Sequence, residues 1–477
     1  MTDTTAVPGS WGELLGRDYG RATTVLAGGV ALYAINEFIT MSLLPSVVAD
    51  IGGARLYAWV TTVYLVASVV SATTVGPVLT RFGPRRSYLG ALLFFAGGTA
   101  VCAAAPSMTV LLAGRLAQGL AGGVLAGLGY AVISAALPER LWTRATAVVS
   151  AMWGVGTLIG PASGGLFAQF GLWRWGFGLL MFGAVLMAVL VPIALPSRGG
   201  ATEQRVRIPV RSLALLGAAA LMVSVAAIPR NPAITVGLLV SAAVAVAVFV
   251  VVDRGSAAHV LPRRTFEPGP LKWIYLTMGL LMAATMVDMY APLFGQRLGG
   301  LPPAAAGFLG AALSVGWTVA EIRSASISDR RIVARVVRWA PAVMAAGLGL
   351  SVLAIRDGAG PIAIAAWALA LAVSGAGIGA AWPHLSVWAM GSAGGASAGG
   401  ASVGGASVDE PGEQAVAAAA INTVQLMCAA FGAGVAGVVV NLRAEPDAPA
   451  AQWLFAGFAG LAAVGWLASS RAAGTPG

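Results

Sequence analysis

Long apolar runs dominate the chain, and short polar segments separate them. Several runs exceed the ~20 residues that an α-helix needs to cross ~30 Å of hydrocarbon. The pattern therefore predicts an all-α polytopic membrane protein. The runs predict fourteen membrane-spanning helices, at residues 24–48, 57–79, 87–106, 109–133, 144–168, 175–196, 212–229, 233–252, 272–295, 303–322, 339–355, 361–388, 414–440 and 451–470.

The basic residues lie mainly in the short segments between the runs. The chain has 28 Lys and Arg against 18 Asp and Glu. When the N-terminus is placed in the cytoplasm, most Lys and Arg fall in cytoplasmic segments, and Arg115 alone lies inside a span. Cytoplasmic loops of membrane proteins carry an excess of these residues. The charge pattern thus predicts cytoplasmic N- and C-termini and an even number of spans, and it does not indicate a nucleic-acid partner.

Composition agrees with a lipid environment and excludes several kinds of site. Hydrophobic residues make up 58% of the chain and charged residues only 10%, whereas soluble domains carry about 25% charged residues. Lys272 is the one lysine, and no G-K-[ST] phosphate-binding loop is present. His259 and His384 are far apart, and Cys102 and Cys428 stand alone. We expect no metal, no cofactor and no enzymatic chemistry.

Composition shifts along the chain predict its domains. The predicted order is a cytoplasmic N-terminus without a cleaved leader, a six-helix bundle, a linker, two extra helices, a second linker, a second six-helix bundle and a short tail. The corresponding residues are 1–22, 23–196, 197–211, 212–253, 254–271, 272–470 and 471–477, and the Gly/Ala/Ser-rich stretch 391–413 is expected to be a flexible loop within the second bundle.

The two bundles also show weak internal similarity. Alignment of Gly160 with Gly432 brings the fifth span onto the thirteenth, and alignment of the Gly-Gly pairs at 52–53 and 299–300 brings the first onto the ninth. Two similar halves fit a transporter built of parallel repeats.

The sequence GPVLTRFGPRR (76–86) stands between the second and third spans. It resembles the loop signature of the major facilitator superfamily, with matches at the conformational loop positions Gly76, Arg81, Gly83, Arg85 and Arg86. Gly83 suits a tight turn. Thr80 stands where the family has an acid, so the salt bridge that this acid forms in the family is not expected here.

The fourth span begins LLAGRLAQGLAGG (111–123), which resembles the family's fourth-helix motif. The resemblance implies a part in proton transfer for Arg115, with Gln118 beside it. A charge inside a span costs at least ~2.5–3.5 kcal/mol on insertion scales, so it needs a partner or water. The alternative is that Arg115 extends its head to the outer end of the helix.

The fifth span contains GTLIGPASGG (156–165). It is similar to the family's antiporter signature, with matches at Gly156, Gly160, Pro161, Gly164 and Gly165, and it is associated with drug:proton exporters. Glycines at positions i, i+4 and i+8 give a flat stripe on which another helix can pack, and the proline bends the helix. We expect the other half of the protein to close against this stripe.

Two carboxylates within spans are the candidate proton carriers, because titratable groups at membrane depth are functional hypotheses by default. Glu37 lies near the middle of the first span, and Asp288 lies in the ninth. Asn36, not Glu37, holds the spacing to Pro45 that the family's acid has, and one residue rotates a side chain by about 100°. Glu37 could instead pair structurally with Arg115. The Glu37 and Asp288 carboxylates are expected to face one central cavity.

Further polar and aromatic residues are expected in the protein interior. The candidates for the substrate cavity are Asn36, Gln118, Trp153, Tyr290, Asn422 and Gln425. Glu321, beside Arg323 at the cytoplasmic end of the tenth span, is expected to form an ion pair. His384 is expected to be a polar interface residue.

Taken together, the sequence is identified as a member of the fourteen-span drug:proton antiporter branch of the major facilitator superfamily. WRWGF (173–177) and AINTVQL (420–426) also resemble that branch. The resemblance implies a monomer in a bacterial inner membrane that exports hydrophobic or amphipathic small molecules in exchange for protons. The alternatives are a nutrient importer on the same fold, a polytopic membrane enzyme and a sensor without transport.

Overall fold

The computed structural model describes residues 10–196, 208–229, 231–327, 329–393, 411–442 and 447–473. Within these ranges all regular structure is helical, and thirteen helices are long and apolar enough to cross a membrane. One further apolar helix, α9 (Val210–Val225), is shorter. The predicted all-α fold is confirmed, and each of the fourteen predicted spans contains one of these helices.

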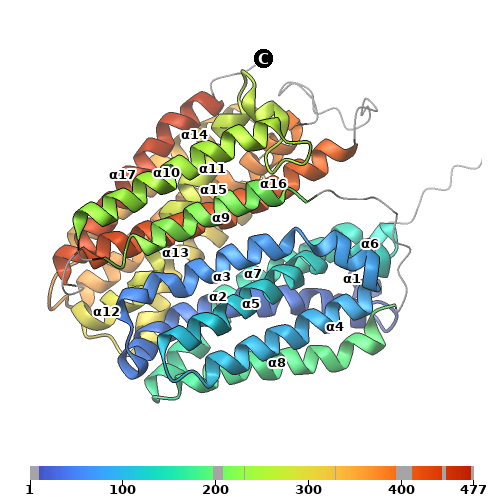
Figure 1. Ribbon diagram of the computed structural model, residues 1–477, viewed down its shortest axis with the longest axis horizontal. Helices are drawn as coiled ribbons and strands as arrows, with labels where there is room; N and C mark the ends of the chain where they lie inside the picture. Colours follow the sequence, from blue (N-terminus) through green and yellow to red (C-terminus); the bar gives the residue numbers. More distant parts are fainter. Residues whose placement is uncertain are drawn as a thin grey trace, which may run out of the picture. The chain divides into compact units, whose positions relative to one another are not determined.

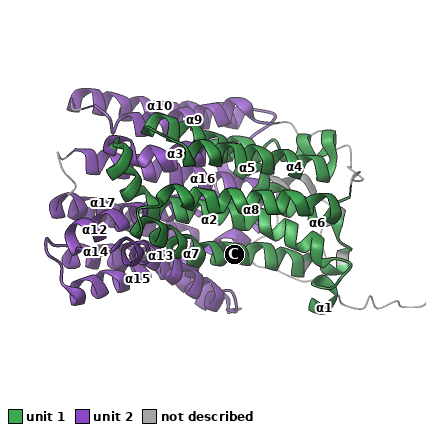
Figure 2. Cartoon of the chain, turned by 90° about the horizontal axis from the view of Figure 1, so that it is seen from below, with its two compact units in different colours: residues 1–53, 67–207 green, residues 54–66, 208–477 purple. Residues whose placement is uncertain are grey.

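The helices form two compact units, which Figure 2 shows in different colours. The described part of unit 1 runs to Gly53 and then from Ala67 through the eighth helix. Its helices are α1 (Trp11–Leu14), α2 (Gly20–Ile51), the end of α3 (Tyr57–Ala72), α4 (Val75–Ala103), α5 (Met108–Ala131), α6 (Ile133–Ala136), α7 (Glu139–Gln169) and α8 (Trp173–Ala194).

Unit 2 contains residues 54–66 and the described residues from Ile208 onward. Its elements are η1 (Ala54–Leu56), the start of α3, α9, α10 (Pro232–Gly255), η2 (Arg263–Phe266), α11 (Leu271–Thr285), η3 (Met286–Tyr290), α12 (Ala291–Gly299), α13 (Pro303–Ser324), α14 (Arg330–Ala354), α15 (Pro361–Ala393), α16 (Pro411–Asn441) and α17 (Ala448–Ala473). The helices α9 and α10 pack on each other, and α9 also packs on α16 (Figure 1).

Corresponding helices of the two units make the same pairs. In unit 1, α2 packs on α5, α7 and α8, while α4 packs on α5 and α8. In unit 2, α11 packs on α15, α16 and α17, while α14 packs on α15 and α17. The aligned glycines lie in corresponding helix contacts, since Gly160 lies against Phe38 of α2 and Gly432 lies against Ala283 of α11.

A hydrogen bond from a side chain to a carbonyl oxygen joins two helices at one end of each unit. Arg174 at the start of α8 donates through Nη2 to the carbonyl oxygen of Ala105, which follows α4, at 3.2 Å. Gln452 at the start of α17 donates through Nε2 to the carbonyl oxygen of Ile355, which follows α14, at 2.9 Å. Each bond satisfies a carbonyl that the end of a helix leaves without an internal partner.

The boundary between the second and third spans differs from the prediction. The predicted span 57–79 is too long, because α3 ends at Ala72 and α4 begins at Val75. The predicted loop 76–86 is therefore helical on both sides of a single break at Gly83, whose φ of 72° and ψ of 169° are not helical. Glycine adopts positive φ without steric penalty, and Pro84 suits the first turn of the helix that follows.

The ninth predicted span is not one continuous helix. Residues Met286–Tyr290 form the 3₁₀ segment η3, which lies between α11 and α12. A 3₁₀ segment has three residues per turn in place of 3.6. Asp288 lies inside this segment, so the period of the α-helix does not give the direction of its side chain.

The start of α3 is held by the rest of unit 2. Arg55 Nη1 donates to the carbonyl oxygen of Ile228 at 2.9 Å, and Trp59 Nε1 donates to that of Ser224 at 2.9 Å. Asn441, at the end of α16, donates through Nδ2 to the carbonyl oxygen of Arg55 at 3.0 Å. The extra helix α9 and the residues just after it thus hold residues that precede them by more than 150 positions in the chain.

Candidate functional site

Arg115 is the centre of a buried polar network in unit 1. Its side chain is 1% exposed, and Nη1 donates to Gln118 Oε1 at 2.9 Å, to Asn36 Oδ1 at 3.1 Å and to Thr40 Oγ1 at 3.3 Å. Gln118 in turn donates through Nε2 to Thr99 Oγ1 at 2.9 Å. The guanidinium thus joins α5 to α2, Gln118 joins α5 to α4, and the arginine does not extend to the end of its helix.

The geometry separates the roles of Asn36 and Glu37. Asn36 is 0% exposed and accepts from Arg115, so the position that holds the family's acid contacts the arginine here through an amide. Glu37, the next residue, is 8% exposed, and its Oε2 has no hydrogen-bond partner among the described residues. Glu37 is therefore a buried carboxylate beside the network, and proton carriage by it stays a prediction.

Sequence reasoning missed the two threonines of this network. Thr40 lies four residues after Asn36, so the helical period places both on one face of α2. That spacing could have indicated Thr40 as a second acceptor once Asn36 was suspected. Thr99 carries no such signal, because only the packing of α4 on α5 brings its hydroxyl to Gln118.

The glycine stripe of α7 packs on α2. A Cβ at Gly156 would lie 2.6 Å from Ala34 Cβ, one at Gly160 would lie 2.5 Å from Phe38 Cβ, and one at Gly164 would lie 2.7 Å from the Ile39 carbonyl oxygen. Pro161 lies inside the helix, and Gly165 is buried. The prediction that a helix packs on the stripe is confirmed. The expectation that the other half closes against it is wrong, because α2 of the same unit already covers it.

Asp288 lies in unit 2, two residues before Tyr290, which belongs to an aromatic cluster. Asp288 is 5% exposed within η3. The rings of Tyr290 and Tyr57 are stacked with centroids 4.8 Å apart, and Phe294 lies 6.0 Å from Tyr290. Tyr57 donates its hydroxyl to the carbonyl oxygen of Met289 at 3.1 Å. Glu37 and Asp288 belong to different units, and a cavity shared by them stays a prediction.

The remaining cavity candidates lie at corresponding places in the two units. Trp153 of α7 packs edge-on against Tyr33 of α2, with centroids 5.5 Å apart. Ser150, which the sequence alignment pairs with Asn422, is exposed and lies 3.2 Å from the Tyr130 hydroxyl. Asn422 is also exposed, and Gln425 is partly buried. Both halves therefore present a polar side chain at the same point of α7 and α16.

The conformational loop has no charged latch within its own segment. Thr80, at the place of the family's acid, donates to the carbonyl oxygens of Gly76 and Pro77 at 3.1 and 3.0 Å. Arg81 is exposed and lies over the Phe82 ring at 5.5 Å from its centroid. Arg86 is exposed and Arg85 partly buried.

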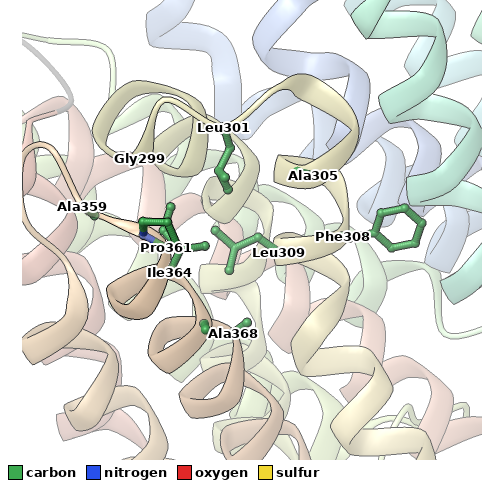
Figure 3. Close-up of a pocket in the computed structure, with 10 residues that line it drawn as sticks. Gly299, Leu301, Ala305, Phe308, Leu309, Ala359, Pro361, Ile364 and Ala368 are labelled. Carbon is green, nitrogen blue, oxygen red and sulfur yellow. The ribbon is translucent and has the colours of Figure 1, made fainter.

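A cavity of about 430 Å³ in unit 2 lies away from all these residues. The ends of α12, α13 and α15 surround it, and every residue that lines it is apolar or glycine. Figure 3 shows Leu301, Leu309 and Ile364 close together, with Phe308 of α13 to one side. With no polar group to orient a ligand, the cavity is suited to apolar chains alone.

Within the described residues, no group of three His, Cys, Asp or Glu side chains could hold a metal ion. Glu321 accepts a hydrogen bond from Trp317 Nε1 at 2.8 Å. The ion pair expected between Glu321 and Arg323 is absent from the described part of the chain.

Other proteins resemble this chain in sequence and fold. Two strains of Mycobacterium tuberculosis each have a protein named "Probable multidrug-efflux transporter", which is 57% identical over 99% of this chain and 98% of its own length. The multidrug transporter protein MdtP of Bacillus subtilis is 24% identical over 61% of this chain and 54% of its own length.

Solved structures of transporters share the fold. The nucleoside transporter NupG has a TM-score of 0.65 at 13% identity, covering 95% of this chain and 98% of its own. A peptide transporter of the POT family has a TM-score of 0.64 at 15% identity, covering 96% of this chain and 97% of its own. Residues 26–408 match the family model described as the Major Facilitator Superfamily. With this match, the repeated helix pairs and the buried arginine of α5, the chain belongs to the Major Facilitator Superfamily of membrane transporters.

Proposed function

We propose that the protein exports hydrophobic or amphipathic compounds from the cell in exchange for protons. The observation that carries the proposal is the buried Glu37 carboxylate next to the Arg115 network in unit 1. The relatives that are 57% identical along nearly their whole length are named as probable multidrug-efflux transporters, which supports export of several compounds.

The network suggests how a proton acts on α2. A deprotonated Glu37 is attracted to the Arg115 guanidinium, and a protonated one is not, so protonation changes the force between α2 and α5. Arg115 is held by Gln118 on its own helix and by Asn36 and Thr40 on α2. A proton can shift a conformational equilibrium only by as much as the two states differ in affinity for it. Here that difference arises from the change in distance between Glu37 and Arg115.

The proposal includes the place of the protein in the cell. In the proposal it is a monomer in a bacterial inner membrane with both termini in the cytoplasm, and the excess of Lys and Arg in the predicted cytoplasmic segments supports this orientation. Composition shifts along the chain support two six-helix bundles at 23–196 and 272–470, an extra helix pair at 212–253, linkers at 197–211 and 254–271, and cytoplasmic ends at 1–22 and 471–477. Most of the predicted linker 197–211 and of the predicted loop 391–413 lies outside the described residues. Substrate would bind between bundles that open alternately to the two sides.

Vesicles that contain the purified protein test the direction and the coupling together. A fluorescent amphipathic dye, Hoechst 33342, is added outside, and a pH gradient of either sign is imposed. Inside-out protein in vesicles with an acid interior should accumulate dye, and Glu37→Gln should abolish the dependence on the gradient. Glu267→Gln is the matched control, because Glu267 is an exposed carboxylate at the end of η2.

Two results would overturn the proposal. If dye accumulates only with the opposite gradient, the protein is an importer. If Glu37→Gln and Asp288→Asn both retain full gradient-driven transport, these carboxylates do not carry the proton.

A further inference from the structure

The apolar cavity of unit 2 lies near the starts of α13 and α15. Farther along, these two helices touch, because a Cβ at Gly316 or Gly375 would collide with the backbone of the facing helix. Near their starts the lining includes Ala305, Ala365 and Ala368, whose methyl groups leave a hollow of about 430 Å³ unfilled. Protein interiors leave few voids larger than a water molecule, and ligand pockets measure about 300–1,000 Å³. The hollow therefore has the size of a ligand site.

The cavity opens on the surface of unit 2. Phe308, Pro361 and Ala365 line it and are exposed, and Figure 3 shows the Phe308 ring to one side of the other labelled residues. Ile362 and Leu369, each next to a lining residue of α15, are exposed as well. Both helices are long and apolar enough to cross a membrane, so these side chains meet the hydrocarbon of the bilayer. A lipid chain can therefore enter the cavity from the side.

Two arginines lie close in sequence to the lining residues. Arg297 is in the last turn of α12, two residues before Gly299, and Arg356 follows α14, three residues before Ala359. The Ala359 backbone nitrogen donates to the carbonyl oxygen of Leu298 at 3.1 Å, which holds the two segments together. Both arginines are exposed, and no Asp or Glu of the described ranges lies within 4.0 Å of either guanidinium. This end of the cavity therefore carries two cations that are available to an anion.

We infer that the cavity holds an acyl chain of an anionic phospholipid from the bilayer, with the lipid phosphate at Arg297 and Arg356. The two parts of such a molecule match the two parts of the site, because the lining is apolar and the arginines are positive. Guanidinium groups form strong paired hydrogen bonds with phosphate oxygens. Asp357, exposed beside Arg356, opposes the anion with one charge against two.

The chain binds by filling space. A chain that leaves the bilayer interior gains no hydrophobic free energy, because the lipid around it is equally apolar. An empty hollow, however, leaves its walls without contacts on one side, and an inserted chain restores the dispersion attraction that they lack. The cavity should therefore accept the chains of different lipids, while the arginines select among headgroups. This inference does not depend on export or on proton coupling.

Native mass spectrometry of the purified full-length protein tests the headgroup. The protein in detergent is incubated with equal amounts of phosphatidylglycerol, which is anionic, and phosphatidylethanolamine, which has no net charge, and the retained lipids are counted. One arginine near a membrane surface contributes about fivefold to the binding of anionic lipid. The double variant Arg297→Gln/Arg356→Gln should therefore bind phosphatidylglycerol roughly 25-fold more weakly and phosphatidylethanolamine within about twofold. Arg254→Gln, an exposed arginine in the last turn of α10, is the matched control.

A second variant tests the chain. Ala368→Phe places a ring in the hollow, so it should remove the tightly bound phosphatidylglycerol although both arginines remain. Ala366→Phe adds the same ring on an exposed position of α15 outside the lining and should retain the lipid. Size-exclusion profiles and melting temperatures show that each variant is folded. If Ala368→Phe is misfolded, Ala365→Leu replaces it, because Ala365 is an exposed lining residue that can accept a larger side chain.

Four results would overturn the inference. The native protein and the double arginine variant could retain the two lipids in the same ratio, or Ala368→Phe could retain as much phosphatidylglycerol as Ala366→Phe. Complete displacement of phosphatidylglycerol by inorganic phosphate would show that the arginines bind a free anion. A dimer mass that disappears in Ala368→Phe would assign the groove to a second copy of the chain. Failure of the export proposal changes none of these measurements, since no gradient is applied.

Discussion

The contact between α7 and α2 gives the sharpest prediction, through the change Gly160→Ala. The new Cβ would lie 2.5 Å from Phe38 Cβ and 3.0 Å from the Ile39 backbone nitrogen. Since ordinary contacts between carbon atoms are about 3.5–4.0 Å, α2 and α7 must separate by roughly 1 Å. The Ile39 backbone cannot move aside as a flexible side chain could.

Small-to-large changes at such contacts cost about 1–3 kcal/mol. The added methyl alone should not destabilise a helix, because alanine is favoured over glycine in helices by about 0.5–1 kcal/mol. Gly97→Ala isolates that effect, since a Cβ at Gly97 in α4 would have open space around it. We therefore expect Gly160→Ala to melt below both the native protein and Gly97→Ala.

Thermal unfolding of the purified variants, followed by tryptophan fluorescence, measures the effect, and vesicle transport of Hoechst 33342 measures its consequence. Transport should fall as well, because α2 carries Asn36, which accepts from Arg115. The reasoning is refuted if Gly160→Ala is as stable and as active as Gly97→Ala.

Three further outcomes are expected elsewhere in the molecule. Arg115→Met should lower the melting temperature, because its buried oxygen acceptors lose their donor at about 1–3 kcal/mol each; an unchanged melting temperature would contradict the network. Trp59→Phe removes the bond to the Ser224 carbonyl and should speed hydrogen exchange at the start of α3 by about two- to tenfold, while unchanged exchange would show that this bond does not hold it. At the N-terminus, the hydrogen bond from Arg140 lowers the pKa of Glu13 below its usual range. The pair therefore stabilises the fold at neutral pH and is lost as pH falls below that range, so Glu13→Gln should match the native protein only in acid, as thermal melts at several pH values would show.

The sequence predicts that each helix exists more accurately than it predicts the residues at which the helix begins and ends. Runs of apolar residues require helices in lipid, and each predicted span contains one. The end of α3 was missed because the apolar run continues through Leu79, and Thr73 and Thr74 are weak signals of a turn. The break at η3 was missed for a similar reason, because Met286–Tyr290 contains no glycine or proline.

Less of the candidate site than of the fold could be predicted from the sequence. Arg115 and Gln118 are three residues apart, so one helix suffices to predict that they lie together. Their partners Asn36 and Thr99 come from α2 and α4, and no spacing in the chain specifies which helices will pack around α5. The hydrogen bonds from Arg55 to Ile228 and from Trp59 to Ser224 of α9 are likewise set by tertiary packing alone.

The 3₁₀ segment has a mechanical consequence for the span that contains Asp288. A continuous helix behaves as a stiff rod, so a tilt at one end appears at the other. A 3₁₀ segment has poorer hydrogen-bond geometry than an α-helix. We therefore expect the span to bend more easily at η3 than within the 15 residues of α11 or the 9 residues of α12. Spin labels placed on either side of η3 should therefore report different angular changes during one transport cycle, and equal changes would show that the span moves as one rigid helix.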